Sequence, residues 1–125
     1  MPDQHKLVAI LPCRDLDASE AFYAKLGFSR VIDHEGYRIL SDGKGAQLHL
    51  NDAVADWVTP SRNPNGLYLF ADDVDELAAP LGPSLIHPPE HKPWGMYEFA
   101  LSDPDGTLVR VGRGSSRSLQ PRDHG

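Results

Sequence analysis

The sequence contains one cysteine, Cys13, among its 125 residues. A single thiol excludes a disulfide within the chain and a zinc site built from several cysteines. Cys13 follows an apolar segment, so we expect it to be a small buried side chain rather than a nucleophile. The N-terminal residues also lack the pattern of a secretory signal peptide. These absences are typical of a cytoplasmic protein.

Long apolar runs and an excess of positive charge are missing as well. No apolar run approaches the roughly 20 residues that a membrane-spanning helix needs. The formal net charge is −6, with 12 basic and 18 acidic residues. Because nucleic acids and anionic membranes both select basic surfaces, we expect neither as a main partner. The negative charge favours a cationic ligand only mildly, since acidic residues also serve solubility.

The chain has the composition of one compact globular domain. Its two halves repeat the order strand, helix, strand, strand, strand. In the first half we expect strands at residues 7–11, 28–33, 37–40 and 46–50. In the second half we expect them at residues 67–71, 85–87, 96–101 and 108–111. Residues 88–95 are proline-rich and are predicted to form a loop.

Matching aspartate and glycine positions support this repeat. Asp15-Leu16-Asp17 and Leu26-Gly27 in the first half correspond to Asp73-Val74-Asp75 and Leu81-Gly82 in the second. Asp17 with Glu20 predicts a capping-box-like helix start. We therefore expect a single domain over residues 1–112, with modules at about 5–55 and 64–112. Residues 113–125 are predicted to form a polar, flexible tail.

Three segments carry a resemblance to a known family. They are RDLDASEAFYAKLGF (14–28), LYLFADDVDEL (67–77) and KPWGMYEFALSDPDGTLVRVG (92–112). Together they resemble the glyoxalase/bleomycin resistance protein/dioxygenase (vicinal oxygen chelate) superfamily, and the third segment looks most like its bleomycin-resistance subgroup. The resemblance implies an α+β fold, in which two tandem βαβββ modules form a curved, mostly antiparallel sheet cup.

The resemblance also locates the metal ligands of the metal-dependent members. Counted from the matching aspartates, these positions fall on Val8, Gly66 and Arg110 in this sequence. An apolar side chain, a hydrogen atom and a guanidinium cannot bind a divalent metal. His49 could be a ligand, but one histidine does not make a site. We therefore expect no metal, no cofactor and no catalytic residue.

The alternation of side chains along the strands predicts which residues face the cup. The predicted ligand-binding residues on the strands are Gln47, His49, Tyr68, Phe70, Glu98 and Arg110. We expect Arg110 to be buried and to form a bidentate pair with Glu98. This pair either contributes to ligand binding or is purely structural.

Two tryptophans complete the predicted site. Trp94, in the proline-rich loop, is predicted to stack on a planar ligand, and the alternative is an edge residue that covers the core. Trp57 lies in the long connection, where it forms either the opposite wall of the site or an anchor for the loop.

The sequence as a whole predicts a metal-free binding protein rather than an enzyme. By resemblance, a cytoplasmic homodimer would sequester bleomycin or a similar aromatic or cationic antibiotic in a cleft between subunits. One alternative is a metal-dependent enzyme of the glyoxalase or dioxygenase type. The other is a protein that binds a cellular metabolite and has no antibiotic role.

Overall fold

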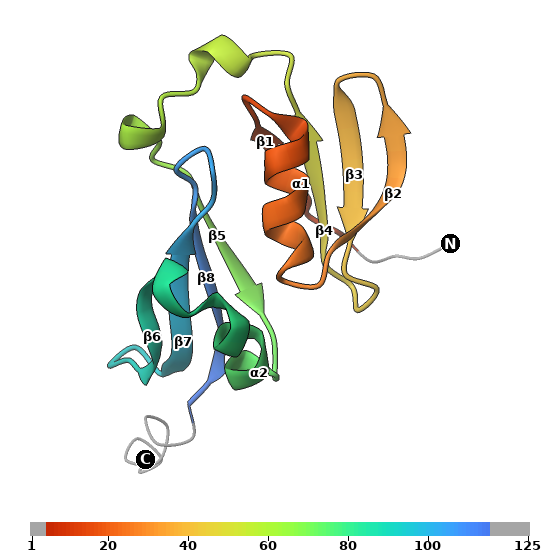
Figure 1. Cartoon of the computed structure of the whole chain (residues 1–125). Helices are drawn as coiled ribbons and strands as arrows, with labels where there is room; N and C mark the ends of the chain where they lie inside the picture. Colours follow the sequence, from red (N-terminus) through yellow and green to blue (C-terminus); the bar gives the residue numbers. More distant parts are fainter. Residues whose placement is uncertain (1–4, 116–125) are drawn as a thin grey trace. The chain divides into compact units, whose positions relative to one another are not determined.

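The computed structural model describes residues 5–115 of the chain (Figure 1). The described residues form two compact units, which divide between Thr59 and Pro60. Each unit has its own four-stranded sheet with one parallel and two antiparallel strand pairs. The fold is therefore α+β and consists of two βαβββ modules, as the sequence predicted.

The first unit places one helix against its sheet. Its elements are β1 (Ala9–Pro12), α1 (Leu16–Ala24), β2 (Ser29–His34), β3 (Tyr37–Ser41), β4 (Gln47–Asn51) and the 3-10 turn η1 (Ala55–Trp57). The strand order is β1-β4-β3-β2, so β1 and β2 are the edge strands. The buried core includes Tyr23 and Leu26 of the helical segment and Leu40, Leu48 and Leu50 of the sheet.

The helix start differs from the predicted capping box. Asp15 is the N-cap, and its side chain accepts hydrogen bonds from the backbone N–H groups of Asp17 and Ala18. Glu20 does not cap the helix, because its carboxylate binds Arg30 and Arg38 from the strands. Asp15 satisfies the free N–H groups of the first turn, and this leaves Glu20 available for the sheet.

The second unit repeats the same topology. Its elements are η2 (Pro60–Arg62), β5 (Gly66–Phe70), α2 (Val74–Ala78), η3 (Ala79–Ser84), β6 (Leu85–His91), β7 (Met96–Ser102) and β8 (Leu108–Gly114). The strand order is β5-β8-β7-β6. Val74, Phe99, Leu101, Val109 and Val111 are buried in its core.

Strand β6 is longer than the sequence predicted. It continues through Pro88 and Pro89 to His91, where we expected a loop. The prolines are tolerated because β6 is an edge strand, on which a missing N–H need not break a hydrogen bond to a neighbour. The pairing of β6 with β7 is irregular between His87 and Glu90, at the position of the two prolines.

The last strand extends beyond residue 112, into the segment that was predicted to be a tail. Strand β8 includes Arg113 and Gly114, and Ser115 is buried, with its N–H donating to the backbone oxygen of Gly95 at 2.8 Å. The rest of the predicted tail lies outside the described residues.

Side-chain hydrogen bonds connect the start of the second unit to the turn between β7 and β8. Asp103 accepts hydrogen bonds from the N–H groups of Asp105 and Thr107, at 2.8 and 2.9 Å. Asn63 donates to the backbone oxygen of Asp105 at 2.8 Å and to the Thr107 hydroxyl at 3.2 Å. Gly106 has a φ of +86°, and an added Cβ would lie 2.2 Å from the Pro60 oxygen. The turn between β7 and β8 thus requires Gly106.

Candidate functional site

Three strands of the second unit bring polar side chains to one face of the sheet. On β8, Arg110 lies opposite Tyr68 of β5 and opposite Ala100 of β7, while Gly112 lies opposite Glu98. Directly opposed residues share a face of a sheet, and so do residues two apart along a strand. Tyr68, Glu98, Arg110 and Gly112 therefore lie on the same face, as the alternation predicted.

Glu98 is the centre of this arrangement. Its side chain is 0% exposed. Its Oε1 accepts hydrogen bonds from the Tyr68 hydroxyl at 2.9 Å and from Trp94 Nε1 at 3.1 Å. Its Oε2 accepts one from Arg110 Nη1 at 3.2 Å. Three donors, one of them cationic, offset the loss of hydration of the buried carboxylate.

The pair between Glu98 and Arg110 is present, but its geometry differs from the prediction. Glu98 is the buried member, and the Arg110 side chain is 37% exposed. The contact is a single hydrogen bond rather than a bidentate one. Tyr68 and Trp94 both donate to Oε1, and this accounts for the absence of a second bond from Arg110 to that oxygen.

The Tyr68 hydroxyl is held in its neutral form. Burial raises the pKa of Tyr68 well above its ordinary value, and the hydrogen bond to Glu98 raises it further. The ring of Phe70 lies 4.7 Å from the Tyr68 ring, measured between centroids. Phe70 is itself 72% exposed. Tyr68 therefore serves Glu98 as a donor, while Phe70 leaves an aromatic surface open.

Gly112 lies on the face that the alternation predicted, but the sequence reasoning gave it no role in the site. A Cβ at this position would lie 2.3 Å from the Tyr68 hydroxyl oxygen and 2.7 Å from Glu98 Cβ. Real Cβ atoms do not approach other atoms so closely. The glycine leaves the space in which the tyrosine reaches the carboxylate. Its one signal in the sequence is a glycine inside a strand, which often marks a close approach.

Trp94 lies in the turn between β6 and β7. The N–H of Gly95 donates to the backbone oxygen of Lys92 at 3.1 Å, with Pro93 and Trp94 between them. Proline suits the second position of such a turn, and Gly95 has the positive φ of +88° that glycine adopts readily. Trp94 is 56% exposed, while its indole N–H is fixed on Glu98. The ring is therefore both anchored and accessible.

The opposite face of the same sheet has a different role. Tyr97 donates to Asp75 of α2 at 2.6 Å, and the Arg113 guanidinium lies 4.8 Å from the centre of the Tyr97 ring. The hydrogen bond to Asp75 raises the pKa of Tyr97. Helix α2 packs on this side of the sheet, as Figure 1 shows. This face therefore joins helix to sheet and leaves the other face to the Glu98 group.

In the first unit His49 forms a hydrogen bond with Tyr37, a pairing that was not predicted. The Tyr37 hydroxyl and His49 Nδ1 are 2.6 Å apart, and the two rings make an edge contact. His49 lies opposite Ile10 in the first sheet, as Arg110 lies opposite Tyr68 in the second. His49 and Arg110 thus occupy equivalent places in the two modules.

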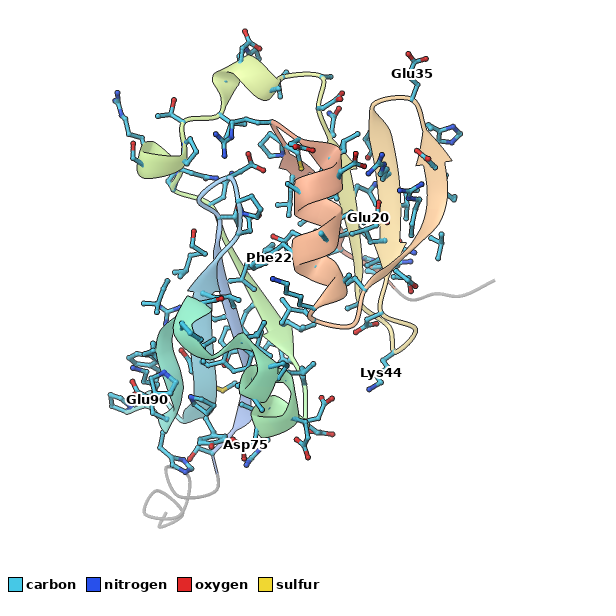
Figure 2. All side chains as sticks on the ribbon, in the orientation of Figure 1. Glu20, Phe22, Glu35, Lys44, Asp75 and Glu90 are labelled. Carbon is cyan, nitrogen blue, oxygen red and sulfur yellow. The ribbon has the colours of Figure 1, made fainter. Side chains whose placement is uncertain are left out.

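The two remaining predicted residues also lie in the first unit. Gln47 shares the His49 face of β4, because the two are two residues apart, and it is partly buried. Trp57 ends η1 and is exposed. The structure thus brings together Tyr68, Phe70, Trp94, Glu98 and Arg110, and it places Gln47, His49 and Trp57 in the other unit. Figure 2 shows the side chains of both units.

The described residues contain neither a cluster of metal ligands nor a membrane-spanning helix. Between residues 5 and 115, no three histidine, cysteine, aspartate or glutamate side chains are grouped so that they could hold a metal ion. In the same part of the chain, no helix has both the length and the apolar character needed to cross a membrane.

Comparisons with known proteins place this geometry in a family context. The model of the Glyoxalase/Bleomycin resistance protein/Dioxygenase superfamily matches residues 5–111. A bleomycin resistance protein of Klebsiella pneumoniae is 36% identical over 111 residues, which cover 81% of this chain and 86% of the relative.

Solved structures give the same result. The structure of a bleomycin resistance determinant encoded on the transposon Tn5 matches with a TM-score of 0.75 and 31% sequence identity. The match covers 89% of this chain and 98% of the chain of that determinant. The structure of a bleomycin-binding protein in complex with bleomycin also has a TM-score of 0.75 and 31% sequence identity, and the match covers 90% of this chain and 100% of that protein's chain.

Proposed function

The chain belongs to the glyoxalase/bleomycin resistance protein/dioxygenase superfamily, and from this premise we propose that it binds a bleomycin-type antibiotic or a similar ligand with aromatic and cationic groups. The ligand is sequestered without chemical change. Similarity to a bleomycin resistance protein and to a protein solved with bleomycin supports this proposal.

The observation that carries the proposal is the exposed indole of Trp94, anchored on a buried carboxylate. An accessible aromatic ring that is already oriented can stack on a planar ligand with little further loss of side-chain entropy. Tyr68 and Phe70 add aromatic surface to the same group. Gln47, His49 and Trp57, which belong to the first unit, are proposed as ligand-binding residues in their own right.

The residues of this site argue against a metal-dependent reaction. Arg110 stands where the resemblance places a metal-binding glutamate, and a guanidinium repels a divalent cation. The Glu98 carboxylate, which could bind a metal, is already bonded to three donors. The Arg110 guanidinium and the fully hydrogen-bonded Glu98 carboxylate do not form a site for a divalent metal. The proposal therefore assigns no catalytic residue and no cofactor.

We further propose that the protein is a cytoplasmic homodimer. Apolar side chains on the edge strands of the first sheet, Ile10 on β1 and Val31 and Ile32 on β2, are exposed. Exposed apolar side chains along a sheet edge favour association with another chain. Light scattering coupled to size-exclusion chromatography tests this directly, and a monomeric mass at tens of micromolar would contradict it.

Titration with bleomycin tests the function. We expect saturable quenching of tryptophan fluorescence, with a Kd of about 10 μM or tighter, and the same stoichiometry by calorimetry. Trp94→Ala should weaken binding at least about tenfold, a loss of about 1.4 kcal/mol. Arg113→Lys, on the opposite face of the same sheet, is the matched control and should bind like the wild type.

Two results would contradict the proposal in different ways. Absence of quenching and of heat at tens of micromolar bleomycin would favour a protein that binds another metabolite. Stoichiometric nickel, zinc, manganese or iron after mild purification would instead favour a metal-dependent enzyme of the same superfamily.

A further inference from the structure

The guanidinium of Arg110 has more donors than Glu98 uses. An arginine offers five N–H donors in a rigid fork. Among residues 5–115, Arg110 forms one hydrogen bond, from Nη1 to Glu98 Oε2, and its Cζ lies 5.8 Å from the centre of the Trp94 ring. The side chain is 37% exposed. Donors on this fork therefore remain available to a group that approaches from solvent.

The indole of Trp94 already has cations near it. Lys92 Nζ lies 5.6 Å from the ring centre, and Arg110 Cζ lies 5.8 Å from it. The negative face of an aromatic ring attracts cations, but here two positive groups occupy positions around one indole. Lys92 is paired with Glu90 and Arg110 with Glu98, so both cations are held beside the ring, and a third cation would have to compete with them for its face.

The nearby carboxylate does not change this preference. Glu98 is fully buried, and its two oxygens accept three hydrogen bonds from Tyr68, Trp94 and Arg110. A cationic group on the ligand could reach it only by displacing one of these donors. The side chains that this group presents to solvent are therefore the Trp94 ring, the Arg110 fork and the ring of Phe70.

From this geometry we infer that the part of the ligand that lies on Trp94 is a planar aromatic ring carrying an oxygen acceptor, which Arg110 binds through its free N–H groups. A carboxylate fits best, because the fork matches two carboxylate oxygens. The inference rests on the proposed function and specifies which chemical group of the ligand this face selects.

Three small probes of the same shape test the inference. They are 2-naphthoate, 2-naphthalenemethanol and 2-naphthylmethylammonium, which share the ring and differ in the attached group. Binding to the full chain is followed by the indole N–H signals in proton–nitrogen correlation spectra, with the Trp94 signal assigned from Trp94→Phe. We expect naphthoate to shift the Trp94 signal and to bind about tenfold more tightly than the alcohol. The ammonium compound should bind most weakly.

Variants at Arg110 distinguish the effect of the planar guanidinium on probe binding from the effect of its positive charge alone. Arg110→Lys keeps the positive charge beside Glu98 but loses the planar fork, so most of the preference for naphthoate over the alcohol should disappear. Arg113→Lys removes a matched arginine–aromatic contact on the opposite face and should leave the preference unchanged. The dispersion of the same spectra shows whether each variant is folded. If Arg110→Lys does not fold, the order of the three probes on the wild type still decides.

Several outcomes would overturn the inference. Equal affinity for naphthoate and the alcohol, tighter binding of the ammonium compound, or an unchanged preference in folded Arg110→Lys would each do so. A separate bleomycin titration distinguishes the two proposals. Bleomycin binding without a naphthoate preference refutes only the inference. A naphthoate preference without bleomycin binding refutes only the proposed antibiotic ligand.

Discussion

Glu98 draws its three hydrogen-bond partners from three different places in the chain. Tyr68 comes from β5, Arg110 from β8, and Trp94 from the turn four residues earlier. A buried carboxylate that loses a donor keeps its desolvation penalty, which amounts to about 1–3 kcal/mol per unsatisfied group. Each of these side chains therefore constrains the position of the others.

Gly112→Ala tests the space that this arrangement needs. The added methyl group would overlap the Tyr68 hydroxyl and Glu98 Cβ. We expect a loss of unfolding free energy of about 1–3 kcal/mol, which is typical of overpacking, measured by urea denaturation. Gly114→Ala is the control, because a Cβ there meets nothing within 4 Å. If the two variants were equally stable, Gly112 would not be needed for the approach of Tyr68.

The raised pKa of Tyr68 predicts how the unfolding free energy changes at alkaline pH. The ordinary pKa of a tyrosine hydroxyl is 10, and the pKa of Tyr68 in the folded protein is higher. Above pH 10 the folded state therefore retains a proton on Tyr68 that the unfolded state loses. Stability is then fully present below about pH 10 and falls as the pH rises further. Tyr68→Phe should be less stable at neutral pH and should lose less stability between pH 9 and pH 11.

Urea titrations at several pH values measure this difference. Tyr97→Phe is a useful comparison, because the pKa of Tyr97 is also raised but its partner is Asp75 on the other face. A Tyr68→Phe profile parallel to that of the wild type would contradict the assignment.

The faces of these side chains and the pairing of Glu98 with Arg110 could be predicted from the sequence, and the hydrogen bonds from Tyr68 and Trp94 could not. Alternation along a strand fixes the side of the sheet on which Glu98 and Arg110 lie. It does not reveal that Trp94 and Tyr68 share one oxygen of Glu98, which reduces the bidentate pair to a single bond. Such competition depends on distances between strands that are remote in sequence.

At the scale of elements, α1 is linked to its sheet by charge as well as by apolar packing. Arg38 of β3 binds Asp17 at 2.8 Å and Glu20 at 3.0 Å, both on α1. Its side chain is 15% exposed, and the hydrogen bond to Asp17 is the main cause of its raised pKa. The sequence predicted these strands and this helix within a few residues, but it assigned Glu20 to the helix cap.

Arg38→Met should therefore weaken the attachment of the helix. We expect a loss of about 1 kcal/mol of unfolding free energy at low salt, above the median for exposed ion pairs because several carboxylates share the arginine. Arg30→Met is the matched control, since Arg30 also binds Glu20 and Asp33 but is more exposed. The difference between them should shrink in 0.5 M salt, where the Debye length is about 4 Å. An equal or larger loss for Arg30→Met would contradict this prediction.

The prolines of β6 show a limit of local reasoning. Pro88 and Pro89 are turn-forming residues, and the sequence alone predicts a loop there. The edge position of β6 removes the penalty, because no further strand pairs with its outer side. Which strand lies at an edge is a property of the whole sheet, so this element could not be predicted from the residues around it.

At the scale of the whole molecule, the repeated order of elements predicted both modules correctly. Aspartates at matching positions precede both helices, with Asp15 before α1 and Asp73 before α2. The matching glycines are less exact, because α2 ends at Ala78 and Gly82 lies inside η3. The ligand and the state of association depend on surfaces that a repeat does not specify. They remain proposals.

Sequestration predicts a stoichiometric rather than a catalytic relation between protein and drug. We expect bleomycin released from the complex by denaturation to have its original mass and chromatographic retention after prolonged incubation. Protection of bleomycin-sensitive DNA from cleavage should be complete only when the protein equals or exceeds the drug. Protection at a small fraction of the drug concentration, or a modified product, would show turnover instead.

The anchored turn of Trp94 has a further consequence for the speed of capture. Because its indole is held on Glu98 and its backbone is closed by Gly95 and Lys92, this turn does not have to fold before the ligand docks. A protein that works by capture competes with the drug's target for time, so the association rate decides how much drug escapes. A population in which most molecules are ready to bind loses little of its intrinsic affinity, and association at about 10⁶ M⁻¹s⁻¹ or faster is then within reach.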